Sequence, residues 1–151
     1  MDALGRYIEI MNIRNDGKYT VDIDVDDRLV EYRMPAHVLQ PLVENAMTHG
    51  LGNKAESCLL TIAGRAEADC VFLEVSDNGK GLEPEAVQAM QAMLDSADEW
   101  EYADYHLKGV ALVNIQKRIR ARYGKRYGLS VRGSPNEGFA VSVWLPYIED
   151  R

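Results

Sequence analysis

The sequence has few cysteines, no long apolar run and no excess of basic charge, and each absence argues against a class of protein. Only Cys58 and Cys70 occur in 151 residues. Two cysteines are too few for a disulfide-rich fold, and their spacing fits no metal-binding motif. We therefore predict that both are reduced core residues of a cytosolic protein. No apolar run approaches a membrane span, and the first residues lack a secretion signal. The net charge of −7 argues against nucleic acid as a partner, because neutralising phosphates needs a basic surface.

The composition that remains is typical of one soluble globular domain. Hydrophobic residues make up 46% and charged residues 27% of the chain. A chain of this length and composition can bury one substantial core. Because no repeat or linker divides the sequence, we predict a single domain over residues 1–151.

The spacing of apolar residues predicts an alternation of helices and strands. Helical spacing predicts helices over residues 3–14, 35–50, 84–94 and 109–123. Alternation predicts strands over residues 19–25, 58–64, 70–76, 129–132 and 139–145, with a further short strand within 29–34. Residues 95–108 have no clean period and are predicted to form a mobile surface loop. Helices on one side of a mostly antiparallel sheet give an α+β fold, a two-layer α/β sandwich.

The helix predicted over residues 35–50 separates an apolar face from a polar one. The apolar face holds Leu39, Leu42, Val43, Ala46 and Met47, and the polar face holds His37, Glu44, Asn45, Thr48 and His49. Asn45 offers a neutral oxygen suited to Mg²⁺, which takes few protein ligands, and Glu44 is a candidate base. A polar face is also what a solvated helix presents, so the pattern alone leaves both interpretations open.

Two glycine-containing segments are further candidates for ligand contact. Residues 77–81 (DNGKG) follow a predicted strand. They form either a tight turn or a loop in which the Asp77 carboxylate accepts a hydrogen bond from an amine while Gly79 and Gly81 let the backbone approach a flat ring. Gly109 opens the helix over 109–123, where unpaired N–H groups favour phosphate. Each segment is a weak signal by itself.

Taken in order, these segments resemble the GHKL ATPases. Residues 40–50 (QPLVENAMTHG) resemble the N box of that superfamily, in the form found in LytS/YesM-type sensor histidine kinases. Residues 77–81 are similar to its first glycine box, residues 109–115 (GVALVNI) to the second, and Gly138 to the third. The resemblance extends from about residue 6 to residue 146 and implies the Bergerat (GHKL) fold, with a mixed, mostly antiparallel sheet and helices on one face.

The resemblance implies the ATP-binding catalytic domain of a two-component sensor histidine kinase. Its reaction is transfer of the ATP γ-phosphoryl group to a histidine on an upstream dimerisation segment, for relay to a response regulator. Asn45 would then hold the Mg²⁺ that bridges the ATP phosphates, with Glu44 as the catalytic base. Residues 82–108 would form the ATP lid. The other implied cofactor-binding residues are Thr48 and His49 near the phosphates, Asp77 at the adenine amino group, Gly79, Gly81 and Gly109 around the pocket, and Leu112.

The sequence departs from the family pattern at two positions. Ala111 stands where a second glycine is usual, and Phe139 stands where a threonine is usual. If the first position needs a positive φ or a very close approach of phosphate, the Ala111 methyl group is unfavourable. Two alternatives therefore stay open: an anti-sigma-factor-like GHKL serine kinase, and a degenerate nucleotide-sensing module without turnover.

None of the histidines lies in the phosphoacceptor context of the family. They are His37, His49 and His106. We therefore predict no self-phosphorylation by this chain. We expect it to be the cytoplasmic domain of a membrane-anchored bacterial kinase, not itself inserted in the membrane, with sensor, membrane and dimerisation segments upstream.

A run of cations lies near the end of the helix over 109–123. Lys and Arg near a helix C-terminus favour the helix dipole and solubility, which explains the run without a partner. The alternative is a docking surface for the dimerisation helices or the response regulator. The run comprises Lys117, Arg118, Arg120, Arg122, Lys125 and Arg126.

Overall fold

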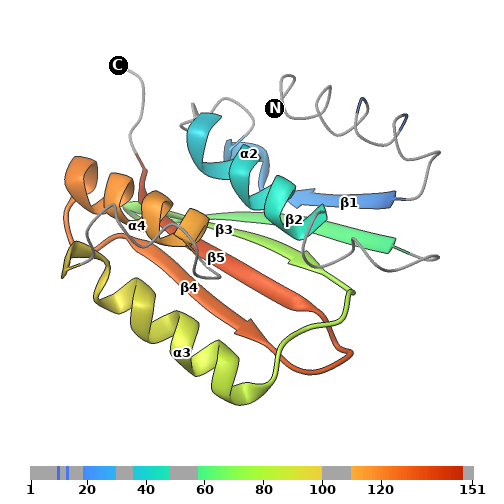
Figure 1. The fold of residues 1–151 in the computed structure, drawn as a ribbon. Helices are drawn as coiled ribbons and strands as arrows, with labels where there is room; N and C mark the ends of the chain where they lie inside the picture. Colours follow the sequence, from blue (N-terminus) through green and yellow to red (C-terminus); the bar gives the residue numbers. More distant parts are fainter. Residues whose placement is uncertain are drawn as a thin grey trace.

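The computed structural model is a mixed sheet with its helices packed on one face (Figure 1). It describes residues 10, 13, 19–29, 36–47, 58–99 and 110–147. In chain order the elements are β1 (Tyr19–Val25), η1 (Asp27–Leu29), α2 (Ala36–Asn45), β2 (Cys58–Glu67), β3 (Cys70–Asp77), α3 (Pro84–Asp95), η3 (Ala97–Glu99), α4 (Val110–Tyr123), β4 (Gly128–Gly133) and β5 (Phe139–Pro146).

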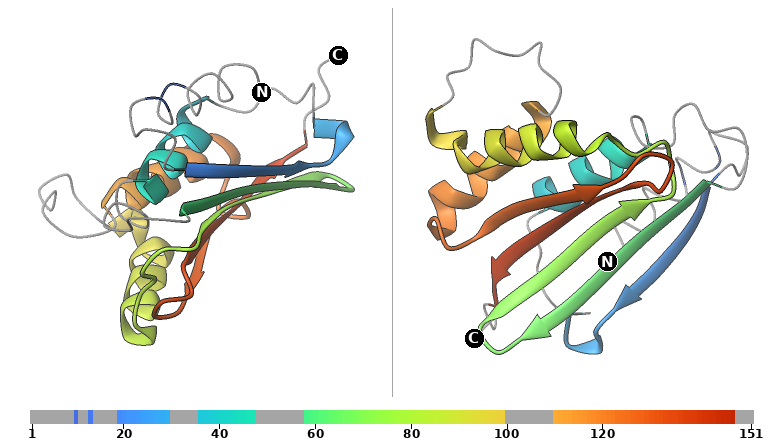
Figure 2. Two further views of the ribbon diagram at one scale, coloured as in Figure 1. Left: turned by 90° about the vertical axis from the view of Figure 1, so that its right-hand side faces the viewer. Right: turned by 90° about the horizontal axis from the view of Figure 1, so that it is seen from below.

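The sheet has five strands in the order β1-β2-β3-β5-β4. The pairs β2–β3, β3–β5 and β4–β5 are antiparallel, whereas β1 lies parallel to β2 with Tyr19 opposite Cys58. Parallel neighbours need a crossover connection, and α2 lies in that connection. The described helices lie on one face of the sheet (Figure 2). The predicted α+β two-layer sandwich is confirmed.

The core lies between this sheet and the helices, as the apolar spacing predicts. In β3, Val71, Leu73 and Val75 are buried, whereas Phe72 and Glu74 face the other side and are half-exposed. The predicted apolar face of α2 is buried along its whole length. In α4, Leu112, Ile115 and Ile119 are buried as predicted, and the helix stops before Gly124, whose φ of +94° suits glycine. Of the two free cysteines, Cys58 is buried and Cys70 is half-buried.

One local prediction is wrong where the structure describes it, and another is described only at its first residue. Asp27–Leu29 is a 3₁₀ turn, because the Leu29 N–H bonds to the Asp26 carbonyl and the Arg28 N–H to the Asp26 side chain, so Leu29 is not part of the short strand expected within residues 29–34. The loop expected from residue 95 begins with packed structure, since Ala97 in η3 is fully buried. The remaining residues of both segments, and most of the helix predicted over 3–14, lie outside the described residues.

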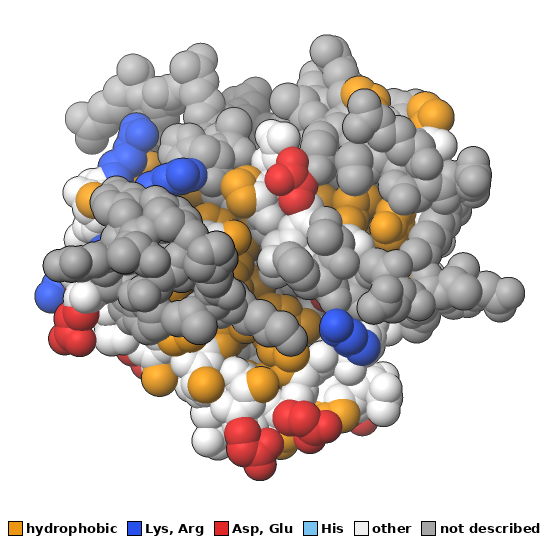
Figure 3. Space-filling model, viewed as in Figure 1, with side chains coloured by type: hydrophobic (Ala, Val, Ile, Leu, Met, Phe, Trp, Pro, Cys, Tyr) orange, Lys and Arg blue, Asp and Glu red, His pale blue; other side chains and the backbone are white. Residues whose placement is uncertain are grey.

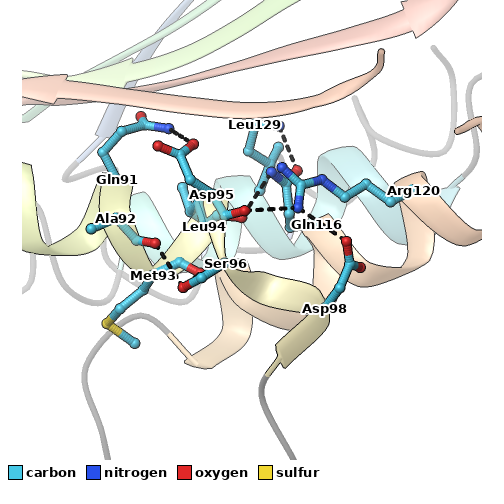
Figure 4. A network of polar contacts seen from close by, with 10 residues as sticks. All are labelled: Gln91, Ala92, Met93, Leu94, Asp95, Ser96, Asp98, Gln116, Arg120 and Leu129. Carbon is cyan, nitrogen blue, oxygen red and sulfur yellow. Dashed lines mark hydrogen bonds and ion pairs between the residues drawn. The ribbon is translucent and has the colours of Figure 1, made fainter. Parts of the chain in front are cut away.

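The edge strand β4 is covered by two glutamine side chains from the helices (Figure 4). Gln116 of α4 is 2% exposed; its Oε1 accepts the Leu129 N–H at 2.7 Å and its Nε2 donates to the Leu94 carbonyl at 3.2 Å. The Gln91 Oε1 of α3 accepts the Val131 N–H at 2.9 Å. An uncovered edge is a template for pairing with another strand, so these contacts protect β4.

Candidate functional site

Glu44 and Asn45 lie at the C-terminal end of α2. The helix ends at Asn45 and continues as a π-helical turn at Ala46 and Met47. Such turns occur frequently at functional sites. The Tyr19 hydroxyl donates to the Met47 carbonyl across 3.5 Å, and burial raises the pKa of Tyr19 above its usual 10.0, so the phenol remains a donor at neutral pH. This bond holds the end of α2 above the first residue of β1.

Glu44 and Asn45 are accessible from solvent, while their neighbours anchor the helix. Glu44 is exposed, and its Oε1 accepts a hydrogen bond of 3.4 Å from Gln40 one turn earlier. Asn45 is half-buried, and its side-chain amide bonds to no other residue of the described part of the chain. An accessible amide oxygen with no internal partner suits a cation that keeps most of its water and phosphate ligands, so Asn45 fits Mg²⁺.

Asp77 is a buried charged residue at the end of β3. It is 8% exposed, and its Oδ1 accepts the N–H of Gly79 at 2.8 Å. This bond helps to fix the orientation of the carboxylate at the strand end. The register places Phe139 of β5 opposite Asp77. The carboxylate is therefore oriented within a largely dry corner at the strand end.

The ends of α2 and β3 meet at the same end of the sheet. Met47 is bound to Tyr19, Tyr19 is paired with Cys58, and two residues further along β2, Leu60 is paired with Asp77. Helix α2 also packs against β3 and α4. The structure thus brings the Glu44–Asn45 end of α2 toward the Asp77 carboxylate, two groups that are far apart in the sequence.

Gly81 is required by contacts within the protein. Its φ is +65°, and a Cβ placed on it would lie 1.9 Å from the Ser134 carbonyl oxygen in the turn between β4 and β5. Gly138 has a φ of +87°, and a Cβ there would lie 1.8 Å from the Asp77 carbonyl oxygen. Both glycines allow the β4–β5 turn to pack directly on the loop over residues 77–81, a reason for Gly81 that differs from the predicted approach of a flat ring.

The structure describes only some of the remaining residues that the sequence analysis considered for the site. Thr48, His49 and Gly109 lie outside the described residues. Leu112 is 1% exposed, so its side chain belongs to the core. Ala111 is exposed in the first turn of α4, and its φ is not positive. The possible backbone strain at Ala111 is therefore absent, because a helix start accommodates alanine well.

Two residues that the sequence reasoning did not single out support the loop over residues 77–81. The Asn78 side chain bonds to Leu59 of β2, and the Asn136 N–H donates to the Lys80 carbonyl at 2.8 Å. Asn136 has a φ of +61°, a conformation in which asparagine is enriched. The sequence signal for Asn136 was its place in a turn-forming segment, SPNEG, directly before the last strand.

Charge is unevenly distributed over the helical face. Figure 3 shows basic side chains over α4 and acidic side chains over one end of α3. In the predicted cation run, Arg120 pairs with Asp98 at 3.3 Å and Arg126 with Asp69 at 3.1 Å. These pairs give both arginines a structural role, as the account without a partner expects. Over the described ranges, no helix has the length and hydropathy that crossing a bilayer requires.

Comparison with known proteins gives a consistent family and fold. The sequence profile of the histidine kinase-, DNA gyrase B- and HSP90-like ATPases matches residues 31–149. The sensor protein LytS of Bacillus subtilis (strain 168) is 28% identical over 97% of this chain and 23% of its own length. The sensor histidine kinase YesM of the same organism is 26% identical over 96% of this chain and 22% of its own.

Solved structures support the same fold. The catalytic domain of the histidine kinase ThkA superposes with a TM-score of 0.63 at 12% identity, covering 96% of this chain and 92% of that domain. The chain spans just under a quarter of the length of the sensor proteins it matches. On the matched profile, the chain belongs to the family of histidine kinase-, DNA gyrase B- and HSP90-like ATPases, and its curated relatives are sensor histidine kinases.

Proposed function

We propose that this chain is the ATP-binding catalytic domain of a sensor histidine kinase. It transfers the ATP γ-phosphoryl group to a histidine on a dimerisation segment of the parent protein, for relay to a response regulator. The observation that carries this proposal is the buried Asp77 carboxylate, oriented by Gly79, at the end of the sheet toward which the Glu44–Asn45 end of α2 points.

We assign roles to Asp77, Asn45 and Glu44 from their surroundings in the structure. Asp77 accepts a hydrogen bond from the adenine amino group, and its low exposure strengthens that bond. Asn45 would hold Mg²⁺ together with phosphate oxygens and water, and the ion supplies charge neutralisation for phosphoryl transfer. Glu44, exposed beside Asn45, is the candidate base or polarising group for the attacking histidine.

The other assignments rest on the family resemblance. Thr48 and His49 would lie near the phosphates, and Gly109 would direct the N–H groups at the start of α4 toward them. Leu112 would contribute through its backbone, since its side chain is in the core. The proposed ATP lid, residues 82–108, includes α3, which packs on β4, and η3.

Calorimetry with ADP and Mg²⁺ tests the base contact. Asp77→Asn is expected to weaken binding about ten- to hundredfold, or about 1.5–3 kcal/mol, because a charged acceptor is replaced by a neutral one. The matched control is Asp22→Asn, an exposed carboxylate on β1, which should bind as tightly as wild type. No detectable binding by the wild-type chain would rule out the ATP assignment.

The magnesium contact has its own test. Asn45→Ala should abolish most of the gain in ATP affinity that Mg²⁺ gives to the wild-type chain, while binding measured in EDTA stays unchanged. Gln40→Ala, at an exposed position of the same helix, is the control and should retain the gain. An equal loss with and without Mg²⁺ would assign Asn45 a different role.

Phosphotransfer decides between the kinase and its alternatives. The chain is mixed with labelled ATP and the dimerisation segment of its parent protein. Acid-labile phosphate on a histidine of that segment is the expected product. Acid-stable phosphate on a serine of an added protein substrate would favour the serine kinase, and intact binding without any transfer would favour the sensing module. The φ of Ala111 is not positive, so backbone strain at that position gives no support to the sensing module.

A further inference from the structure

The loop over residues 77–81 is fixed to β2 by a side chain that imitates a strand residue. The last registered pair of β2 and β3 is Leu60 with Asp77. One residue further on, the Asn78 Oδ1 accepts the Leu59 N–H at 2.8 Å, and the Asn78 N–H donates to the Leu59 carbonyl at 3.2 Å. Asn78 thus satisfies both backbone groups of Leu59 and extends the strand pairing past Asp77.

The opposite side of the loop is fixed by backbone atoms alone. Asn136 donates its backbone N–H to the Lys80 carbonyl, and the Ser134 and Asp77 carbonyls fill the spaces beside Gly81 and Gly138. Among the contacts described for this loop, the bond from the Asn78 side chain to Leu59 is therefore the one that a conservative substitution can remove selectively.

We propose that Asn78 is a positioning residue that sets the selectivity of the site for the adenine amino group. This inference rests on the proposed function, because it needs Asp77 to contact the base. Asp77 lies between the paired Leu60 and the Asn78 anchor, so loss of the side-chain bond leaves a single backbone bond between Asn78 and Leu59 and loosens the orientation of the carboxylate. A fixed acceptor discriminates between partners because its orientation is established before binding.

The test compares two nucleotides that differ at the exocyclic group. ADP carries the amino group, whereas IDP carries an oxygen at that position and cannot donate there. With Mg²⁺ present, the wild-type chain should prefer ADP about ten- to hundredfold. Asn78→Ala should lower that preference to less than about threefold, chiefly by weakening ADP. Asn78→Asp keeps an oxygen acceptor for the Leu59 N–H and should restore most of the preference.

The controls separate positioning from general stability. Asn136→Gly keeps both the N–H donor and the positive φ, so its ADP preference should match wild type. If Asn78→Ala is insoluble, Asn78→Ser, whose hydroxyl is too short to reach Leu59, replaces it. Equal weakening of ADP and IDP in the variant, or an unchanged preference, would overturn the positioning role. A wild-type chain that binds neither nucleotide would overturn the proposed function itself.

Discussion

At the scale of single residues, the glycines of the candidate site and its carboxylate are needed for different physical reasons. Gly81 and Gly138 are fixed by carbonyl oxygens of the protein less than 2 Å from where a Cβ would lie. Asp77 is buried at a cost in desolvation, and the Gly79 N–H offsets part of that cost. The glycines therefore serve the fold, and the Asp77 carboxylate is the group of this loop that we assign to ligand binding.

Alanine at Gly81 should be strongly destabilising. Gly124 is a matched control, because its φ is also positive but nothing lies within 4 Å of the place where a Cβ would be. Gly124→Ala should lower the free energy of unfolding by about 1–2 kcal/mol through backbone strain. Gly81→Ala should cost about 1–3 kcal/mol more, because the methyl group overlaps the Ser134 carbonyl. Urea denaturation of both variants measures the difference, and equal losses would contradict it.

Asp26 gives the fold an acid-sensitive contact. Side-chain and backbone hydrogen bonds from Arg28 lower the pKa of Asp26 from 3.8 to about 2. Because the folded-state pKa is depressed, the contribution to stability is complete above about pH 4 and is lost as the pH falls toward 2. Asp26→Asn should be less stable than wild type at neutral pH, with the gap closing over that window. Thermal melting from pH 7 to pH 2 measures the gap, and a constant gap would exclude this role.

At the scale of secondary-structure elements, Gln116 connects α3, α4 and β4. It is a polar residue within one turn of Leu112 and Ile119, on the buried side of its helix. Its two hydrogen bonds satisfy a carbonyl at the end of α3 and an N–H on the edge of β4. A glutamine at this depth is tolerated because each polar end has a partner.

Replacing Gln116 should remove the hydrogen bonds of both the Leu94 carbonyl and the Leu129 N–H. Gln116→Leu should lower the free energy of unfolding by about 2–4 kcal/mol, since a buried carbonyl and a buried N–H lose their bonds. It should also raise the tendency to aggregate, because the edge of β4 is exposed. Gln88→Leu, at an exposed position of α3, is the control. Denaturation and light scattering are the measurements, and a variant as stable as the control would refute the capping role.

Sequence patterns predicted which segments form helices and strands, but they predicted less well which segments contact one another. Alternation in residues 139–145 was sufficient to identify a strand, because Val141, Val143 and Leu145 face the same core. It did not give the partner of β1, since a strand pattern specifies a buried face and leaves the neighbour open. Likewise Asn45 and Asp77 were found as candidates, but the roles of Asn78 and Gln116 depend on backbone groups of distant residues, which no local pattern encodes.

At the scale of the whole molecule, the residues proposed to bind the nucleotide and Mg²⁺ are divided between two structural units. Strands β2 to β5 form a continuous antiparallel unit with Asp77, whereas Asn45 lies in the crossover that attaches β1 through a parallel pairing. The β1 pairing depends on residues far apart in sequence and on one neighbouring strand. Such units open more readily than the centre of a sheet.

Nucleotide binding should therefore protect β1 and α2 selectively. With Mg²⁺ and ADP, amide hydrogen exchange should slow more in β1 and α2 than in β3 and β5, because the ligand joins the two units. The Asp77→Asn variant, at the same nucleotide concentration, should show a smaller effect. Exchange measured by mass spectrometry provides the comparison. Protection confined to β3 and β5 would contradict a ligand bound by both units.

The close packing of Gly81 and Gly138 also bears on how relatives of this chain lose their activity. Those glycines would remain necessary in a descendant that no longer bound any nucleotide, because the Ser134 and Asp77 carbonyls would still occupy the same space. No such overlap constrains the Asp77 side chain, so a substitution there would not create the same clash. An inactive relative should therefore be identified by a changed carboxylate within an intact glycine pattern.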